Sequence, residues 1–207
     1  MRLVWHRTFI ILAKTGNPTS IFAQKGGIAL FVSNHFQLAR ALAAESDALQ
    51  KHRFRRALFL LGNILPDFLF FTYLRGFQNS HRWIGHNLPH STPAIEKNLK
   101  KRLSVGLRSP HDAFRLGILL HYLADSFTYP HTEQFPGRQP QHSRYERDLI
   151  KIFPRFLPIV RETKPAASAD FLSEARRAYN ALPPSPETDS EWIIRVCAAV
   201  FFAVGSV

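Results

Sequence analysis

The chain has 207 residues, of which 45% are hydrophobic, so it is long enough to bury one sizeable core, and one domain is the default expectation. Its formal net charge of +12 and sequence pI near 10.4 favour anionic partners such as phosphate groups, anionic lipid surfaces or nucleic acid. No compact run of lysine and arginine with interleaved aromatic residues marks a nucleic-acid groove, so nucleic acid is the least favoured of these partners.

The residue pattern predicts an all-α protein built as a single multi-helix domain. Helix-forming residues dominate, and no run alternates polar and apolar residues between hairpin turns. Cys197 is the only cysteine, so an intrachain disulfide is excluded and the redox compartment stays open.

Residues 1–32 differ from the rest of the chain and are expected to be a leader or an N-terminal extension. Met1–Arg7 is basic, a short apolar run follows, and two turn-like stretches precede the first helical pattern. A weak signal peptide, a plain extension and a translation start near Val32 all fit this pattern, so a cytoplasmic and a secreted location both stay open. The folded domain is expected over residues 33–207.

The first predicted helices bring a histidine and an acid into apolar surroundings. Ser33 or Asn34 can cap a helix whose first turn contains His35. Ala57–Leu74 is almost unbroken apolar sequence, but it contains Asp67 directly after a proline. Since an aspartate at the bilayer centre costs about 2.5–3.5 kcal/mol, we expect a buried helix or helix pair broken at that proline rather than a membrane span. A buried Asp67 then needs a cation or another partner.

A loop-like segment over residues 78–93 contains His81, His86 and His90. Most histidines in loops are solvated, but these follow the acid of the preceding helix closely. One or more of them is therefore a candidate metal ligand. The next helix is expected to begin at the Ser-Thr-Pro that ends this segment, with the proline at the first helical position.

The densest set of potential ligands lies in Leu116–Asp148. It consists of two pairs at i,i+4 spacing and one histidine between them: His121/Asp125, His142/Glu146 and His131. Residues four apart on a helix lie on the same face, so two helices would each present one pair. Imidazole nitrogen and carboxylate oxygen suit zinc and its neighbours. We therefore predict two helices that face a shared cleft holding more than one metal ion.

Capping and proline signals predict the bounds of these two helices. The first is expected to start at Ser109, which precedes a proline, and to end before Tyr129. The second is expected to start at Ser143. Its continuation is interrupted by two prolines.

The sequence of the C-terminal third predicts helices that contain no candidate metal ligands. Ser168 or Asp170 can cap a helix that runs through Tyr179. Residues 182–191 form the clearest predicted loop. The apolar run over residues 192–204 is too short to cross a bilayer unaided and is expected to be a core helix.

The order of these acids and histidines resembles the zinc-dependent phospholipase C family and the related single-strand-specific zinc nucleases. ILPDF at Ile64–Phe68 is similar to the family's Pro-Asp motif, HYLAD at His121–Asp125 to its H-x-x-x-D helix, and HSRYE at His142–Glu146 to its later H-x-x-x-E. His35 matches an early family histidine. Because the nucleases usually have Asp as the last ligand, Glu146 favours the phospholipase branch. The resemblance covers His35 to Glu146 and offers nothing for the C-terminal third.

This resemblance implies an all-α enzyme with two or three zinc ions in a cleft. By position, the ligands would be Asp67, His81, His121 and Asp125 for one zinc, His131, His142 and Glu146 for a second, and His35 with a shared Asp125 for a third. His86 or His90 could replace His81. In secreted members an N-terminal Trp completes the third site, whereas here no Trp stands just before His35, and Trp5 lies far upstream.

The resemblance also implies hydrolysis of a phosphodiester by a metal-activated water, with Asp67 as general base. A phospholipid or another phosphodiester would be the substrate, and a lipid substrate implies peripheral membrane contact. Two alternatives stay open. One is a nuclease-like phosphoesterase, and the other is a non-catalytic, membrane-associated metal-binding protein.

Overall fold

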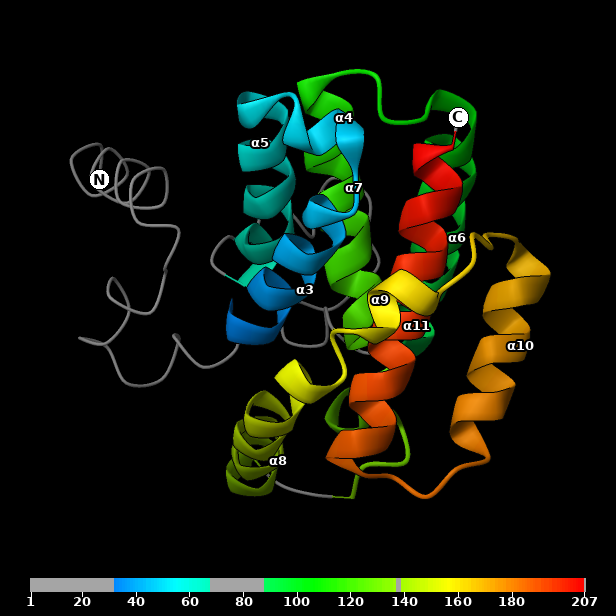
Figure 1. Ribbon diagram of the computed structural model, residues 1–207. Helices are drawn as coiled ribbons and strands as arrows, with labels where there is room; N and C mark the ends of the chain where they lie inside the picture. Colours follow the sequence, from blue (N-terminus) through cyan, green and yellow to red (C-terminus); the bar gives the residue numbers. More distant parts are fainter. Residues whose placement is uncertain (1–31, 68–87, 137–138, 207) are drawn as a thin grey trace.

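The computed structural model describes residues 32–67, 88–136 and 139–206, and within these ranges the chain forms helices and turns without a β-strand (Figure 1). The predicted all-α class is therefore confirmed. The α-helices are α3 (Val32–Ala44), α4 (Asp47–Gln50), α5 (Arg53–Ile64), α6 (Leu88–Val105), α7 (Pro110–Asp125), α8 (Gln139–Ile152), α9 (Ile159–Glu162), α10 (Ala169–Asn180) and α11 (Pro186–Gly205). Short 3₁₀ helices lie between them: η1 (Leu65–Asp67), η3 (Tyr129–His131) and η4 (Phe153–Arg155).

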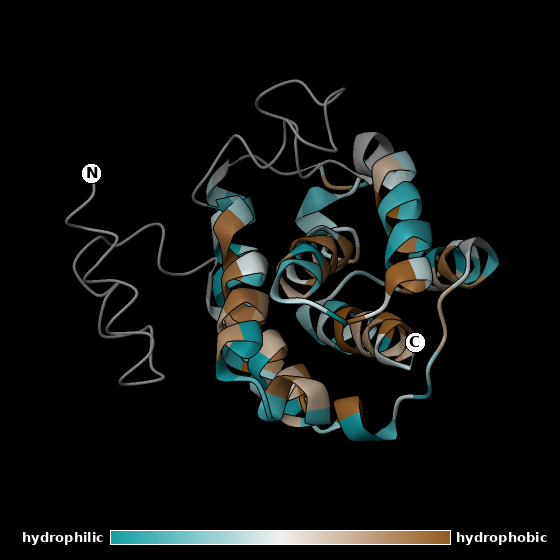
Figure 2. Ribbon diagram, turned by 90° about the horizontal axis from the view of Figure 1, so that it is seen from above, coloured by the Kyte–Doolittle hydropathy of each residue, from teal (hydrophilic) through white to brown (hydrophobic). Residues whose placement is uncertain are grey.

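Helix α7 forms the centre of the fold. Every residue from Leu116 to Asp125 is buried, because α5 packs along α7 on one side and α11 on another. Figure 1 shows α7 and α11 running in opposite directions through the molecule, and Figure 2 shows from above that the apolar residues, in brown, face mainly inwards. Burial of this apolar surface, at about 25 cal/mol per Å², is the main stabilising contribution.

Two glycines let α5 and α7 approach with their backbones in contact. A Cβ added to Gly62 would overlap the carbonyl oxygen of Phe114, and one added to Gly117 would overlap the carbonyl oxygen of Phe59. Any larger residue would therefore push the two helices apart. This close approach brings the C-terminal end of α5 against the last two turns of α7.

A capping box fixes the start of α7. The side chain of Ser109 accepts a hydrogen bond from the Asp112 amide, and the Asp112 carboxylate accepts one from the Ser109 amide, both at 3.1 Å. Asp112 also pairs with the buried guanidinium of Arg102 in α6, at 2.9 Å. Burial would raise the pKa of Asp112, but the hydrogen bonds from Ser109 and Arg102 outweigh burial and lower it. The predicted start at Ser109 is confirmed, and the ion pair links α6 to α7.

The apolar stretch over residues 57–74 is a broken, buried helix as far as the structure describes it. Helix α5 ends at Ile64, and η1 follows with Pro66 as its second residue. Residues 68–74 lie outside the described residues. Over the described part of the chain, no helix combines the length and the apolar character that crossing a membrane requires.

Two predicted helix starts are wrong. Helix α6 begins at Leu88, so Pro93 lies inside the helix and His90 belongs to its first turn instead of to a loop. Helix α8 begins at Gln139 rather than at Ser143. In both helices a proline stands at the second position, where its missing N–H costs no intrahelical hydrogen bond.

The predicted end of the central helix is also too late. Helix α7 stops at Asp125, because the hydroxyl groups of Ser126 and Thr128 donate to the carbonyl oxygens of Leu123 and Ala124, at 2.7 and 3.1 Å. The separate 3₁₀ helix η3 then contains His131. Asp125 therefore stands at the last position of its helix, where the chain turns away.

The loop predicted over residues 182–191 is wrong in its second half. Ser185 caps α11 by accepting a hydrogen bond from the Thr188 amide at 3.1 Å, and Pro186 occupies the first helical position. The core helix expected over residues 192–204 is confirmed, with its start extended by six residues. Ser168 caps α10 as one of the two predicted alternatives.

Candidate metal centre

His121 is the most firmly held of the candidate ligands. It is completely buried in α7, and its Nδ1 lies 2.8 Å from the backbone carbonyl oxygen of Asn63 at the end of α5. A carbonyl oxygen only accepts hydrogen bonds, so Nδ1 carries a proton and donates it there. This contact depends on the glycine approach of α5 to α7. It orients Nε2 towards carboxylates, an arrangement that is common behind metal-bound histidines.

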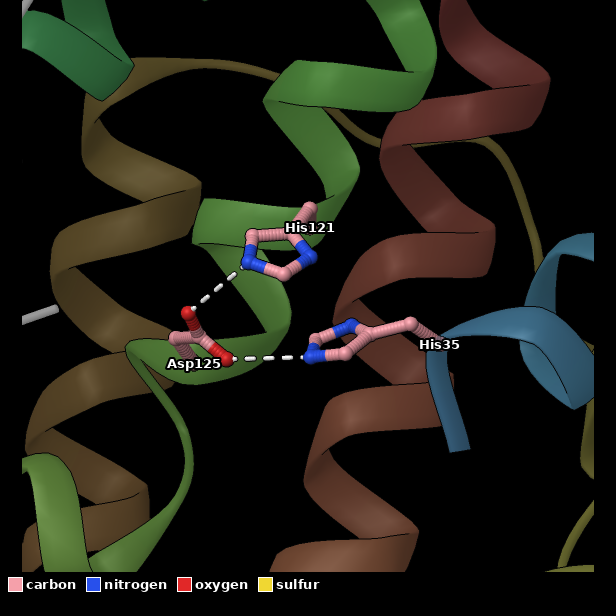
Figure 3. A group of neighbouring side chains, drawn as sticks. All are labelled: His35, His121 and Asp125. Atoms are coloured by element: carbon pink, nitrogen blue, oxygen red, sulfur yellow. Dashed lines mark ion pairs between the residues drawn. The ribbon is translucent and has the colours of Figure 1, made fainter. Parts of the chain in front are cut away.

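Asp125 lies between two histidines from different helices (Figure 3). One carboxylate oxygen is 3.3 Å from Nε2 of His121, one helical turn away, and the other is 3.2 Å from Nε2 of His35 in α3. The two imidazole rings stack with centroids 4.0 Å apart. We call His35, His121 and Asp125 the inner cluster, and each offers one ligand atom within 4.8 Å of the others.

Asp67 joins the inner cluster from η1. Its Oδ1 is 3.5 Å from Nε2 of His121. Its Oδ2 is buried and accepts no hydrogen bond from the described residues. An unpaired buried acceptor costs about 1–3 kcal/mol, and a cation would offset that cost.

A second group lies a short distance along the chain. His142 and Glu146 stand one turn apart on α8, with Nε2 2.7 Å from Oε1. His131 reaches the same Oε1 from η3, at 3.4 Å. We call His131, His142 and Glu146 the outer cluster, and their ligand atoms also lie within 4.8 Å of one another. Glu146 Oε2 is buried without a hydrogen-bond partner among the described residues.

Both clusters face one cavity of about 220 Å³. Its polar wall contains Asp67 and five of the six cluster residues: His35, Asp125, His131, His142 and Glu146. His121 lies behind Asp125 and does not line the cavity itself. Its other wall is largely apolar and consists of Leu38, Ala124, Leu149, Ile150, Phe153 and Ile193. The cavity therefore offers a charged side and an apolar side to one ligand.

The titration of these groups shows how strongly the carboxylates attract positive charge. Burial would lower the pKa of His121, but the carboxylates of Asp125 and Asp67 outweigh burial and raise it to about 9. Burial would also lower the pKa of His131, yet Glu146 and Asp125 raise it. The pKa of Glu146, which burial would raise, is lowered by its hydrogen bonds to the two outer histidines.

The donor set and its spacing fit zinc. Tetrahedral zinc with ligands at about 2.1 Å places ligand atoms about 3.4 Å apart. The inner cluster's nitrogen–oxygen distances of 3.2 and 3.3 Å and the outer cluster's 3.4 Å contact are close to that value. The 2.7 Å contact of His142 with Glu146 is shorter and is a direct hydrogen bond. Asp67 Oδ2 and Glu146 Oε2, which accept no hydrogen bond within the described part of the chain, add further acceptors for a cation.

The structure brings together seven of the eight predicted ligands. His81 and His86 lie outside the described residues, and the side chain of His90 is not described, so the loop ligand stays a prediction. Two residues at or near the cleft were missed by the sequence analysis. Asn34, considered only as a helix cap, lines the cavity with a buried Oδ1. Asp189 fell within the predicted loop, although Ser185–Pro186 before it carries a helix-start signature.

An all-α fold with two histidine–carboxylate clusters in one cleft defines a helical protein with a candidate metal centre. Residues 34–204 match the family model described as zinc dependent phospholipase C, and the chain belongs to this family. Neither the curated proteins nor the solved structures provided a match. The predicted family is therefore confirmed. The match extends to residue 204 in α11. The C-terminal third, in which no family motif was recognised, therefore lies within the matched region.

Proposed function

We propose that this protein is a zinc-dependent phosphodiester hydrolase of the phospholipase C type. The observation that carries the proposal is the convergence of the inner and outer clusters on one cavity. The family to which the chain belongs is zinc-dependent, which supports zinc as the metal. His35, His121, Asp125 and Asp67 would hold one or two ions, and the outer cluster would hold another.

Zinc, when bound, supplies Lewis acidity that polarises a phosphoryl oxygen and lowers the pKa of water. The chain's own residues hold the ligand geometry, because the Asn63 carbonyl fixes the ring of His121 and the last turn of α7 fixes Asp125. Asp67 would accept a proton from the attacking water through Oδ2, and this role is supported by its position at the cavity and by the lack of a hydrogen-bond partner for Oδ2 among the described residues.

The two walls of the cavity favour an amphiphilic substrate. A phosphodiester would lie against the clusters, and an apolar group would lie against the wall that includes Leu149, Phe153 and Ile193. The net charge of +12 draws anionic substrates towards the protein. A phospholipid has both features, and the family supports it as the substrate class.

Activity before and after complete metal removal tests this proposal. Purified protein should hydrolyse a chromogenic phosphodiester and dispersed phosphatidylcholine, lose both activities with a chelator, and regain them with zinc. Activity that survives complete metal removal would contradict the proposal. Hydrolysis of single-stranded DNA without hydrolysis of phosphatidylcholine would favour the nuclease-like alternative. Zinc uptake without either activity would favour the non-catalytic one.

A further inference from the structure

Asp189 is a completely buried carboxylate outside the two clusters. It lies in the first turns of α11, and both of its oxygens accept hydrogen bonds. Oδ2 accepts from the backbone amide of Tyr129 at 2.8 Å, and Oδ1 accepts from the hydroxyl of Tyr179 in α10 at 2.8 Å. Burying a carboxylate is costly, so its presence in the core calls for a role that an apolar side chain would not fill.

The amide that Asp189 holds belongs to the turn that carries an outer-cluster ligand. Tyr129 is the first residue of η3, and His131 is the last. Within this turn the His131 amide donates to the Thr128 carbonyl at 2.8 Å. Fixing Tyr129 therefore fixes the backbone two residues before the imidazole whose Nε2 lies 3.4 Å from Glu146.

The same region also touches the helix that carries the other two outer ligands. The Tyr129 ring lies 5.8 Å from the ring of Tyr145, the residue before Glu146 on α8. It lies edge-on to Phe135, 5.3 Å away, on the chain that leads into α8. Asp189 thus braces, through Tyr129, the turn and the helix that together make the outer cluster.

The position of Asp189 requires a hydrogen-bond acceptor. Both hydrogen bonds that Asp189 accepts come from other elements, from the Tyr129 N–H and the Tyr179 O–H. Asparagine could keep both bonds, because its oxygen can accept from the Tyr129 N–H while its NH₂ group donates to the Tyr179 hydroxyl oxygen. Leucine is similar in size but accepts no hydrogen bond, so replacing Asp189 by leucine leaves the Tyr129 amide without this partner.

We propose that Asp189 is a positioning residue for the outer metal ligand His131, which it holds in place by anchoring the Tyr129 amide from α11. The inference rests on the proposed metal role of the outer cluster. Loss of a residue that positions a metal ligand typically weakens metal affinity about 10–100-fold, although every ligand is still present.

Chelator competition against zinc, with the ions counted by elemental analysis, tests the inference in the full chain. Asp189→Leu, which removes the acceptor of the Tyr129 amide, should weaken one class of ion about 10–100-fold and leave the other class as in the wild type. Tyr179→Phe is the matched control, since it removes a bond to the same carboxylate but leaves the Tyr129 amide bonded. It should lower thermal stability and keep wild-type zinc affinity.

Three results would overturn the inference: unchanged affinity in Asp189→Leu, an equal loss for all ions, or an equal loss in Tyr179→Phe. Hydrogen exchange on the wild type decides the matter if Asp189→Leu does not fold. The Tyr129 amide should be protected both with zinc and after chelation, whereas protection only with zinc would show that the metal orders the turn. Wild-type protein that takes up no zinc would overturn the proposed function instead.

Discussion

The inner and outer clusters offer similar donor atoms but are assembled differently. The inner cluster joins α3 to α7, which are far apart in the sequence, and its His121 is held by backbone packing between α5 and α7. The outer cluster comes from sixteen consecutive residues, 131–146, and depends on a short turn and one helix. The side chain of His142 is 22% exposed, whereas that of His121 is 0% exposed.

This difference implies that the inner cluster is the more rigid of the two and that the outer cluster is the more accessible to solvent. The inner cluster is enclosed by the core, so its geometry is expected to persist without metal. The outer cluster lies nearer to solvent and relies on Asp189 in α11 as a support. We therefore expect the inner cluster to bind its metal more tightly and the outer cluster to lose its metal first.

The sharpest test of the inner cluster is Asp125→Ala. Because each oxygen of Asp125 faces a different histidine, its loss should release about two ions and lower activity about 10³-fold or more, since a metal supplies several kcal/mol of transition-state stabilisation. Elemental analysis and hydrolysis of a chromogenic phosphodiester measure both effects. Asp47→Ala, an exposed acid on α4, is the control. Full metal content in Asp125→Ala would refute the bridging role.

The matched test of the outer cluster is Glu146→Gln. Gln keeps the shape but lacks the charge, so the variant should bind one ion about 100-fold more weakly and keep the others. Zinc titration against a chromophoric chelator measures the loss. Asp148→Asn, a more exposed acid on the same helix, should bind zinc as the wild type does. Loss of every ion from Glu146→Gln would show that the clusters are not independent.

Backbone packing of the inner cluster is tested by Gly117→Ala. The added Cβ would overlap the Phe59 carbonyl, so the variant should lose about 2–3 kcal/mol of stability and move the Asn63 carbonyl away from His121. Denaturant unfolding of the metal-free protein measures the change. Gly205→Ala is the control, because its Cβ would meet nothing within 4 Å. Equal stability of the two variants would contradict the close approach.

The support of the outer cluster predicts a smaller, pH-dependent effect. Burial raises the pKa of Asp189 to about 6, against hydrogen bonds from Tyr129 and Tyr179 that lower it. Between about pH 4 and 6 the folded protein therefore keeps a proton on Asp189 that the unfolded chain has released. As a result, the free energy of unfolding should fall by on the order of 2 kcal/mol as the pH rises through this range. The free energy of unfolding is measured against pH for the wild type and for Asp189→Asn, whose amide does not titrate. The difference between the two proteins should fall over this pH range, and a difference that is independent of pH would contradict the prediction.

The local part of this description could be predicted from the sequence. The i,i+4 pairs His121/Asp125 and His142/Glu146 follow from helical periodicity, and the cap at Ser109 follows from its Ser-Pro signature. The all-α class and the family follow from composition and from the order of the motifs. The helix boundaries were predicted less accurately. Side-chain hydroxyls end α7 earlier than its pattern indicates, and α6 and α8 begin earlier because each accommodates a proline in its first turn.

The sequence by itself determined which residues have the chemistry of metal ligands, since residue type and helical spacing are local properties. Only the tertiary structure decided that His35 meets Asp125, that a backbone carbonyl of α5 orients His121, and that Asp189 supports the turn of His131. Each of these contacts joins residues at least 58 positions apart in the chain. Such contacts arise from the packing of helices around α7, which no local pattern specifies.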